Sequence, residues 1–161
     1  TGTGLVSIIC ALAGCKSVIA TDFNPLPLQM LEKAAALNGI DKDSIKTELF
    51  DVKAIESQRV PTCDLLLVAD MLYDPATAVA VAKRVAEAVS KGSSVIVGDS
   101  PNRPGRPHFI ARLTELLPDQ PVEFSTVKGE SVVGIRHDLI SDHRAVDPVR
   151  SHELEMGLLI L

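Results

Sequence analysis

Three side chains in the segment LLLVADMLYDP have the types and spacing for chemistry on a cation: Asp70, Tyr73 and Asp74. The five apolar residues before them, Leu65–Ala69, predict a fully buried strand that stops at Asp70. Ligands of open α/β sheets bind at the carboxyl ends of parallel strands, so these three side chains are candidate ligand-binding groups. Two carboxylates and a phenol suit a cationic substrate better than a phosphate.

The elements that must position these side chains follow from the hydrophobic pattern. Strands are expected at 17–21, 45–50, 64–69, 94–98 and 122–127, and helices at 3–14 (short and buried), 25–38, 75–90 and 108–117. Two segments qualify as the closing strand, 131–140 and 155–161, and we favour the second. Strands that alternate with helices imply right-handed crossovers. The chain of 161 residues is therefore expected to form one α/β domain with a doubly wound, Rossmann-like, mostly parallel sheet.

A glycine-rich turn, TGTGL, stands at the start of the first helix. Glycines there let the backbone approach a ligand closely, and the helix N-terminus offers free N–H donors. Counted from Gly2, the dinucleotide fingerprint G-x-G-x-x-G fails because Ser7 replaces its third glycine. A G-x-G-x-G turn that ends at Gly4 fits better. A tight turn without any ligand is the other interpretation.

Acidic residues follow the next two strands. Asp22 comes directly after its strand, 18 positions beyond Gly4, where an acid commonly binds the ribose hydroxyls of a nucleoside. A helix cap or turn residue is the other interpretation of Asp22. Asp51 ends the following strand and is either an acceptor for an adenine amino group or a turn residue. Phe23 either packs on an adenine face or covers the core.

Composition narrows the function classes. The net charge of −5 and the pI of about 5.3 argue against nucleic acid as a partner and are compatible with a basic protein substrate. No stretch approaches the roughly 20 apolar residues of a membrane span. The histidines lack zinc-ligand spacing, so no metal site is expected. Cys10, Cys15 and Cys63 are expected to be buried, reduced thiols.

These motifs resemble, in their order, those of the class I, seven-β-strand S-adenosylmethionine-dependent methyltransferases. The matching segments are Gly2–Gly4, TDFNP, FDV and DMLYD. DMLY is similar to the D-x-x-Y signature of the lysine-methylating branch. GDSPNRP, after the expected fifth strand of the family, is similar to a turn of the electron transfer flavoprotein β-subunit lysine methyltransferases. The resemblance covers roughly residues 1–127.

The resemblance implies roles for individual residues. Gly2 and Gly4 would pass under the methionine part of S-adenosylmethionine, Asp22 would hold the ribose with Phe23 and Asn24 beside it, Asp51 and Val52 would lie at the adenine, and Ala69 would complete the cofactor site. Asp70 and Tyr73 would face the incoming amine as the catalytic residues. The chain departs from the family in an insertion around residues 128–153, in its longer GDSPNRP turn, and in lacking the first strand and first motif glycine. That strand would be central in the sheet.

The expected function is protein-lysine N-methylation by direct displacement, with a lysine-bearing protein as substrate and neither nucleic acid nor membrane as partner. The compartment is expected to be intracellular, cytoplasmic or mitochondrial. Asp70 is expected to bind and orient the amine, because a nearby anion stabilises the ammonium form and cannot by itself help to deprotonate it. Asp74 is either a second recognition acid or, as we favour, the cap of the following helix.

Three other residues and three other functions remain to be weighed. Asp99 is a candidate substrate contact. Arg103 and Arg106 are expected to be solvated loop residues; the other interpretation is that they bind an acidic peptide segment. The alternatives to protein-lysine methylation are a small-molecule N-methyltransferase and a non-catalytic Rossmann-like binding module. A nicotinamide-dependent oxidoreductase is disfavoured by Ser7 and by the lack of a convincing proton relay.

Overall fold

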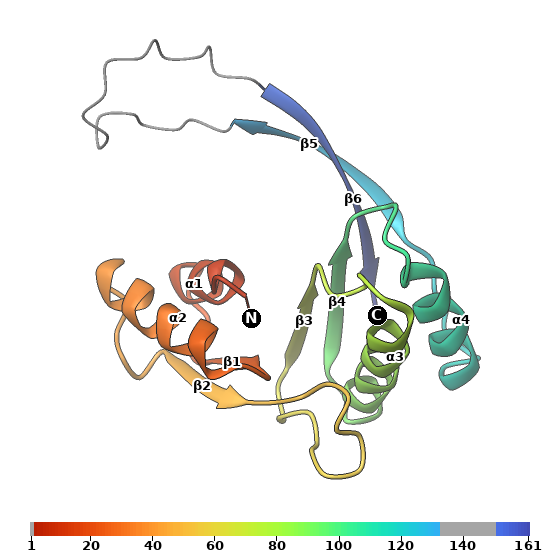
Figure 1. The fold of residues 1–161 in the computed structure, drawn as a ribbon, viewed down its shortest axis with the longest axis horizontal. Coiled ribbons are helices and arrows are strands. Elements are labelled where there is room, and N and C mark those ends of the chain that lie inside the picture. Colours follow the sequence, from red (N-terminus) through yellow and green to blue (C-terminus); the bar gives the residue numbers. More distant parts are fainter. Residues whose placement is uncertain (1, 133–150) are drawn as a thin grey trace.

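The computed structural model describes residues 2–132 and 151–161, which form alternating strands and helices (Figure 1). The elements are α1 (Leu5–Leu12), β1 (Val18–Asp22), α2 (Pro25–Leu37), β2 (Ile45–Leu49), β3 (Leu65–Ala69), α3 (Pro75–Ser90), β4 (Ser94–Asp99), α4 (Arg106–Leu116), β5 (Ser125–Val132) and β6 (Ser151–Ile160). The predicted α/β architecture is confirmed.

The strands form two sheets. β1 pairs with β2 in parallel, and β3 pairs with β4 in parallel. β6 runs antiparallel to both β4 and β5, so the larger sheet has the order β3-β4-β6-β5. In the part of the chain that the structure describes, no strand lies between β1 and β3, and the two sheets stand side by side (Figure 1).

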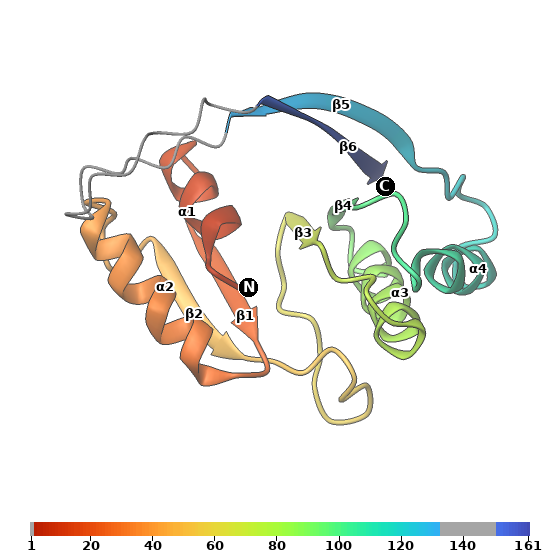
Figure 2. The ribbon, with the colours of Figure 1, turned by 45° about the horizontal axis from the view of Figure 1, so that its top comes forward.

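Each sheet carries its own helices and its own apolar core. α1 and α2 lie with β1 and β2, whereas α3 and α4 pack together beside β3 and β4 (Figure 2). The larger core lies under α3 and α4 and includes Leu72, Val85 and Phe109, all fully buried. The smaller core consists of Ile8, Ala20 and Leu31. The larger core thus supports the carboxyl ends of β3 and β4, where the candidate amine-binding residues lie.

Two predictions about burial were wrong. β3 is not a fully buried strand, because it pairs with β4 along one edge only; Val68 is buried, but Leu65 is 43% exposed. α1 is not a buried helix either. Its buried residues are Ser7 and Ile8, while most of its larger apolar side chains face solvent. Apolar composition predicted both elements correctly but not what covers them.

Several boundaries match the sequence pattern. The helix 75–90 is α3 itself, and the favoured closing strand 155–161 falls almost wholly within β6. The last helix and the strand after it begin at Arg106 and Ser125 rather than at 108 and 122. Most of the expected insertion, and most of the alternative strand 131–140, lies outside the described residues.

Candidate active site

The candidate residues gather where the parallel strands end. β1 ends at Asp22, β2 is followed closely by Asp51, β3 is followed directly by Asp70, and β4 ends at Asp99. In each sheet the carboxyl ends of parallel strands meet at one edge, which is where such folds bind ligands. An aspartate therefore stands at or just beyond the carboxyl end of each of these four strands.

The glycine turn lies against the first of these acids. The Gly2 N–H donates to Asp22 Oδ2 at 3.2 Å, and the Asn24 N–H donates to Asp22 Oδ1 at 3.0 Å. Partial burial acts to raise the pKa of Asp22, but hydrogen bonds, including these two, outweigh it and hold the pKa below its usual value. Asp22 is therefore an ionised acceptor beside the turn, as a ribose-binding acid must be.

Gly2 and Gly4 differ in their surroundings. Both have positive φ angles, 54° and 81°. No atom lies within 4 Å of where a Cβ on Gly2 would stand, whereas a Cβ on Gly4 would meet Leu31 Cδ1 at 2.6 Å. Gly4 is thus required by the contact between α1 and α2, and Gly2 leaves the space above the turn open.

The residues after Asp22 have separate roles. The Asn24 side chain accepts the Leu26 N–H at 3.0 Å and caps α2. Phe23 is 73% exposed, so it does not cover the core. Its contact with an adenine face stays a prediction.

The segment that follows β2 is held by a buried arginine on α3. Arg84, 4% exposed, donates from Nε to the carbonyl of Val52 at 3.1 Å and from Nη1 to the carbonyl of Gln58 at 2.7 Å. Asp51 itself is exposed; its N–H donates to Gln58 Oε1 at 2.7 Å, and its Oδ1 accepts the Lys53 N–H at 2.8 Å. The proposed adenine-side residues therefore sit on a segment that α3 fixes in place.

Asp70 is the one non-glycine residue with a positive φ among those described, at 54°. This left-handed conformation costs roughly 1–2 kcal/mol for most residues, and aspartate is among those that tolerate it best. The Asp70 N–H still donates to the carbonyl of Gly98 at 2.9 Å, as a continuation of the β3–β4 pairing. The turn directs the chain away from the sheet and leaves the Asp70 side chain 61% exposed.

Tyr73 and Asp74 complete the turn. Tyr73 is 49% exposed, and its predicted place beside the incoming amine stays a prediction. Asp74 caps α3: its Oδ1 accepts the Thr77 N–H at 2.9 Å, and its Oδ2 accepts the Thr77 hydroxyl. Hydrogen bonds from the Thr77 hydroxyl and N–H lower the pKa of Asp74. The favoured interpretation of Asp74 as a helix cap agrees with this geometry.

Asp99 does not offer its carboxylate to a substrate. It is 1% exposed, and its Oδ2 accepts the Leu72 N–H at 2.8 Å. Arg103, expected to be a solvated loop residue, instead forms an ion pair with Asp70 and lies 3.4 Å, from Nε, from Asp99 Oδ1. Arg106 is not a plain solvated residue either, because its guanidinium stacks 4.0 Å from the ring centroid of Phe124. These three roles depend on the shape of the loop after β4, which the sequence pattern does not encode.

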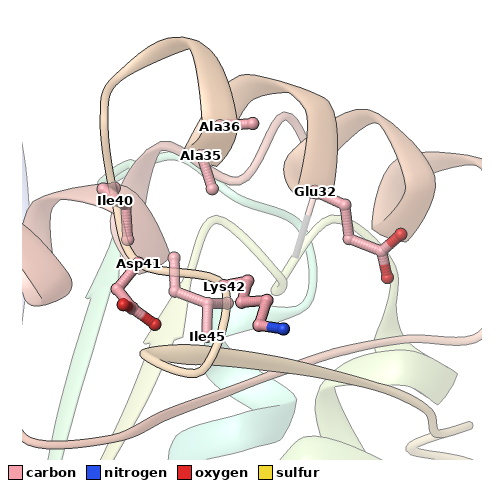
Figure 3. Close-up of a pocket in the computed structure, with 7 residues that line it drawn as sticks. All are labelled: Glu32, Ala35, Ala36, Ile40, Asp41, Lys42 and Ile45. Atoms are coloured by element: carbon pink, nitrogen blue, oxygen red, sulfur yellow. The ribbon is translucent and has the colours of Figure 1, made fainter.

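A cavity of about 300 Å³ lies at the amino end of β2, far along the strand from Asp51. Its lining residues are Glu32, Ala35, Ala36, Ile40, Asp41, Lys42 and Ile45 (Figure 3). Within the described ranges, no three or more His, Cys, Asp or Glu side chains are grouped to hold a metal ion.

Cys10, Cys15 and Cys63 are free, as expected, but the prediction that all are buried was wrong, because Cys15 is exposed and the others are half-buried. Burial, and then Cys15, raise the pKa of Cys10. No helix of the described chain combines the length and apolarity needed to cross a membrane.

Solved structures share this fold. A precorrin 8W decarboxylase of Methanobacterium thermoautotrophicum superposes with a TM-score of 0.62 at 18% identity, over 98% of this chain and 75% of that one. An S-adenosylmethionine-dependent O-methyltransferase of Thermotoga maritima gives 0.60 at 15% identity, over 98% of this chain and 55% of that one. The fold is that of the class I methyltransferases.

The family is defined by sequence. A family model described as lysine methyltransferase matches residues 1–116, and the chain belongs to that family. A Methanocaldococcus jannaschii protein named as a protein N5-glutamine methyltransferase is 36% identical over 50 residues, which is 31% of this chain and 25% of that protein. The match thus spans about a quarter of that relative.

Proposed function

We propose that this protein is an S-adenosylmethionine-dependent protein-lysine N-methyltransferase. The observation that carries the proposal is the exposed pair Asp70 and Tyr73 at the carboxyl end of β3, in a chain that belongs to the lysine methyltransferase family. An accessible carboxylate and phenol on a fixed turn are suited to bind an incoming ammonium group and to align it.

The residues at the ends of β1 and β2 fit the cofactor. Asp22 is an ionised acceptor for ribose hydroxyls, Gly2 leaves open space above the turn, and Phe23 presents an exposed apolar ring. Asp51 has an exposed carboxylate, and the backbone at Val52 is held by Arg84. These residues, together with Gly4, Asn24 and Ala69, are the proposed cofactor-binding set.

Bound S-adenosylmethionine supplies an electrophilic methyl group. The target lysine is protonated at neutral pH, with a reference pKa of about 10.4, and only its neutral form is a nucleophile. Asp70 binds the ammonium form and orients the nitrogen, and Tyr73 lines its path. Loss of water from the site favours the neutral amine, and the proton that the ammonium group gives up passes to bulk solvent before methyl transfer. No side chain needs to form a covalent bond with the methyl group.

A second candidate, glutamine methylation, is raised by the 50-residue match to the M. jannaschii protein. A glutamine amide carries no charge and gains less from a carboxylate than an ammonium does. The exposed carboxylate of Asp70 therefore favours lysine. A protein substrate is favoured over a small molecule because Asp70 and Tyr73 are open to solvent.

Transfer of a tritiated methyl group tests the proposal. The full-length protein is incubated with a cell extract and labelled S-adenosylmethionine, and the labelled residue is identified by mass spectrometry. A methylated lysine side chain in a protein is the expected product. A labelled glutamine or a labelled small molecule would contradict the substrate, and failure to bind S-adenosylmethionine in calorimetry would contradict the enzyme.

A further inference from the structure

The carboxylate proposed to receive the substrate amine already has a cationic partner. Arg103 donates from Nε to Asp70 Oδ1 at 2.9 Å, and its Nη2 bonds to the same oxygen. The two residues are 33 positions apart, on different loops. The Asp70 hydrogen bond, followed by its charge, raises the pKa of Arg103, so the guanidinium stays protonated wherever the enzyme would be assayed.

The same guanidinium faces a second, buried carboxylate. Arg103 Nε lies 3.4 Å from Asp99 Oδ1, an atom without a hydrogen bond, while Asp99 Oδ2 is occupied by the Leu72 N–H. A buried carboxylate needs a counter-charge, since burial disfavours its ionised form. Among the described residues, Arg103 is the cation that forms an ion pair with Asp99. Arg103 therefore links a fixed, buried acid to an exposed one.

The loop that carries Arg103 is fastened to the turn that carries Asp70. The Gly105 N–H donates to the carbonyl of Leu72 at 2.9 Å. A Cβ on Gly105 would stand 2.7 Å from that carbonyl oxygen and 2.6 Å from the backbone oxygen of Asp74, so the loops touch closely. With Asp99 at the end of β4 accepting the Leu72 N–H, both backbone groups of Leu72 are bound by the end of β4 and the loop that follows it. Arg103 thus lies on a loop whose backbone is held against the turn that carries Asp70.

We propose that Arg103 is a positioning residue that clamps the Asp70 carboxylate by bridging it to Asp99. The guanidinium holds Asp70 in place and reduces the negative charge that Asp70 presents to the substrate amine. The inference rests on the proposed function, because it concerns how that site handles an amine. An unpaired Asp70 would bind an ammonium group more strongly but would also hold its proton more firmly. The clamp keeps the Asp70 carboxylate in place to orient the amine, and it weakens the hold of Asp70 on the amine's proton.

Charged and titratable side chains reach this cluster from several elements. They come from the turn after β3, the end of β4, the loop after it, the start of α4 and the connection before β3: Asp70, Asp74, Asp99, Arg103, Arg106 and Lys53. Asp74 is bonded to Thr77, and Arg106 stacks on Phe124. Among the described residues, Arg103 is therefore the cation that forms an ion pair with Asp70, and its removal leaves the Asp70 charge unpaired.

The test is the pH dependence of kcat for lysine methylation by the full-length wild-type protein and Arg103→Gln. The acidic limb of kcat reports the ionisation of the bound amine. We expect Arg103→Gln to move that limb up by about one pH unit, to lower kcat at pH 7 by about tenfold, and to leave KM equal or lower. Arg112→Gln, which removes an exposed ion pair with Glu115 on α4, is the matched control and should leave the limb in place.

An unmoved limb in Arg103→Gln, with the unfolding midpoint near that of the wild type, would overturn the proposal. Arg103→Lys keeps the charge but not the planar fork, so it should lower kcat while leaving the limb within about 0.3 unit of the wild type. A limb that moves equally in both variants would also overturn it. If Arg103→Gln is too unstable to assay, Arg103→Ala takes its place, because it removes the same charge and should move the limb by the same amount.

Failure of the proposed function would look different. In that case the wild-type protein would not methylate lysine at all, or it would methylate an amide and show no acidic limb attributable to an amine. If the wild-type protein methylates lysine and its acidic limb does not move when Arg103 is replaced, the proposed function holds and the clamp is rejected.

Discussion

Asp99 and Leu72 are joined by a buried hydrogen bond that spans 27 residues of sequence, from the Leu72 N–H to Asp99 Oδ2 at 2.8 Å. Leu72 lies in the middle of the turn between Asp70 and Tyr73, and its side chain is fully buried in the larger core. The end of β4 thus fixes the turn that presents the proposed amine-binding residues. Asp99, at the end of β4, therefore has a structural role at the candidate site.

Asp99→Ala should destabilise the protein because it removes this acceptor and leaves the Leu72 N–H buried without a partner. We expect a loss of about 1–3 kcal/mol in the free energy of unfolding, measured by chemical denaturation. Asp99→Asn retains an acceptor oxygen and should lose less. Equal losses in the two variants would show that the hydrogen bond is not what Asp99 contributes.

Gly4→Ala should be more harmful than Gly2→Ala. Both substitutions place a Cβ at positive φ, at a cost of roughly 1–2 kcal/mol. Only the Cβ on Gly4 meets the fully buried Leu31, and such overpacking adds about 1–3 kcal/mol. Thermal unfolding of the two variants measures the difference. Equal destabilisation would mean that α1 and α2 shift to accommodate the added Cβ with no further loss of stability.

Arg84→Met should loosen the proposed adenine-side segment. The substitution keeps much of the apolar volume but leaves the carbonyls of Val52 and Gln58 without their donor and Glu87 without one of its two cations. We expect a loss of about 2–4 kcal/mol in stability and weaker S-adenosylmethionine binding in calorimetry.

A surface variant provides the comparison for Arg84→Met. Arg112→Gln breaks an ion pair whose side chains are 36% and 64% exposed, and it should cost about 0–1 kcal/mol. If Arg84→Met were as mild as Arg112→Gln, the buried network would not be holding the segment.

Glu87 should make stability depend on pH. Burial acts to raise its pKa, but hydrogen bonds from Lys91, Arg84 and the Val60 N–H prevail and hold the pKa below the ordinary value of 4.5. A carboxyl group whose pKa is lower in the folded state stabilises the protein above its unfolded pKa. That contribution is lost as pH falls through 4.5 toward the folded value.

The measurement for Glu87 is the free energy of unfolding from pH 7 to pH 3 in the wild type and Glu87→Gln. The wild type should lose more stability over this range, so the two curves should converge at low pH. Parallel curves would contradict the role of Glu87.

The sequence predicted the elements of this fold well where the signals are local. α3 begins at Pro75 because Asp74 caps it and proline suits a first helical turn, and both facts are legible in the sequence. Strand ends at Asp22, Asp70 and Asp99 follow from apolar runs that stop at an acid. These signals also placed the candidate site at one edge of the sheet.

The pairing of Arg103 with Asp70 could not be predicted in the same way. It depends on how a loop with two prolines and a glycine folds back on a turn 33 positions earlier. One signal was available: an arginine and a glycine that follow closely on a strand-ending aspartate. The burial of Asp99 and the exposure of Leu65 likewise depend on which strands and loops become neighbours, which is tertiary information.

The central claim, that Asp70 receives and orients a lysine amine, is tested most directly by Asp70→Asn in the full-length protein. Methylation of the lysine substrate should fall by about 100-fold or more, because the amine loses its alignment, while the Kd for S-adenosylmethionine should change by less than about twofold. Asp74→Asn, which keeps a good helix cap, should retain activity within about threefold. Activity of Asp70→Asn equal to that of Asp74→Asn would contradict the account.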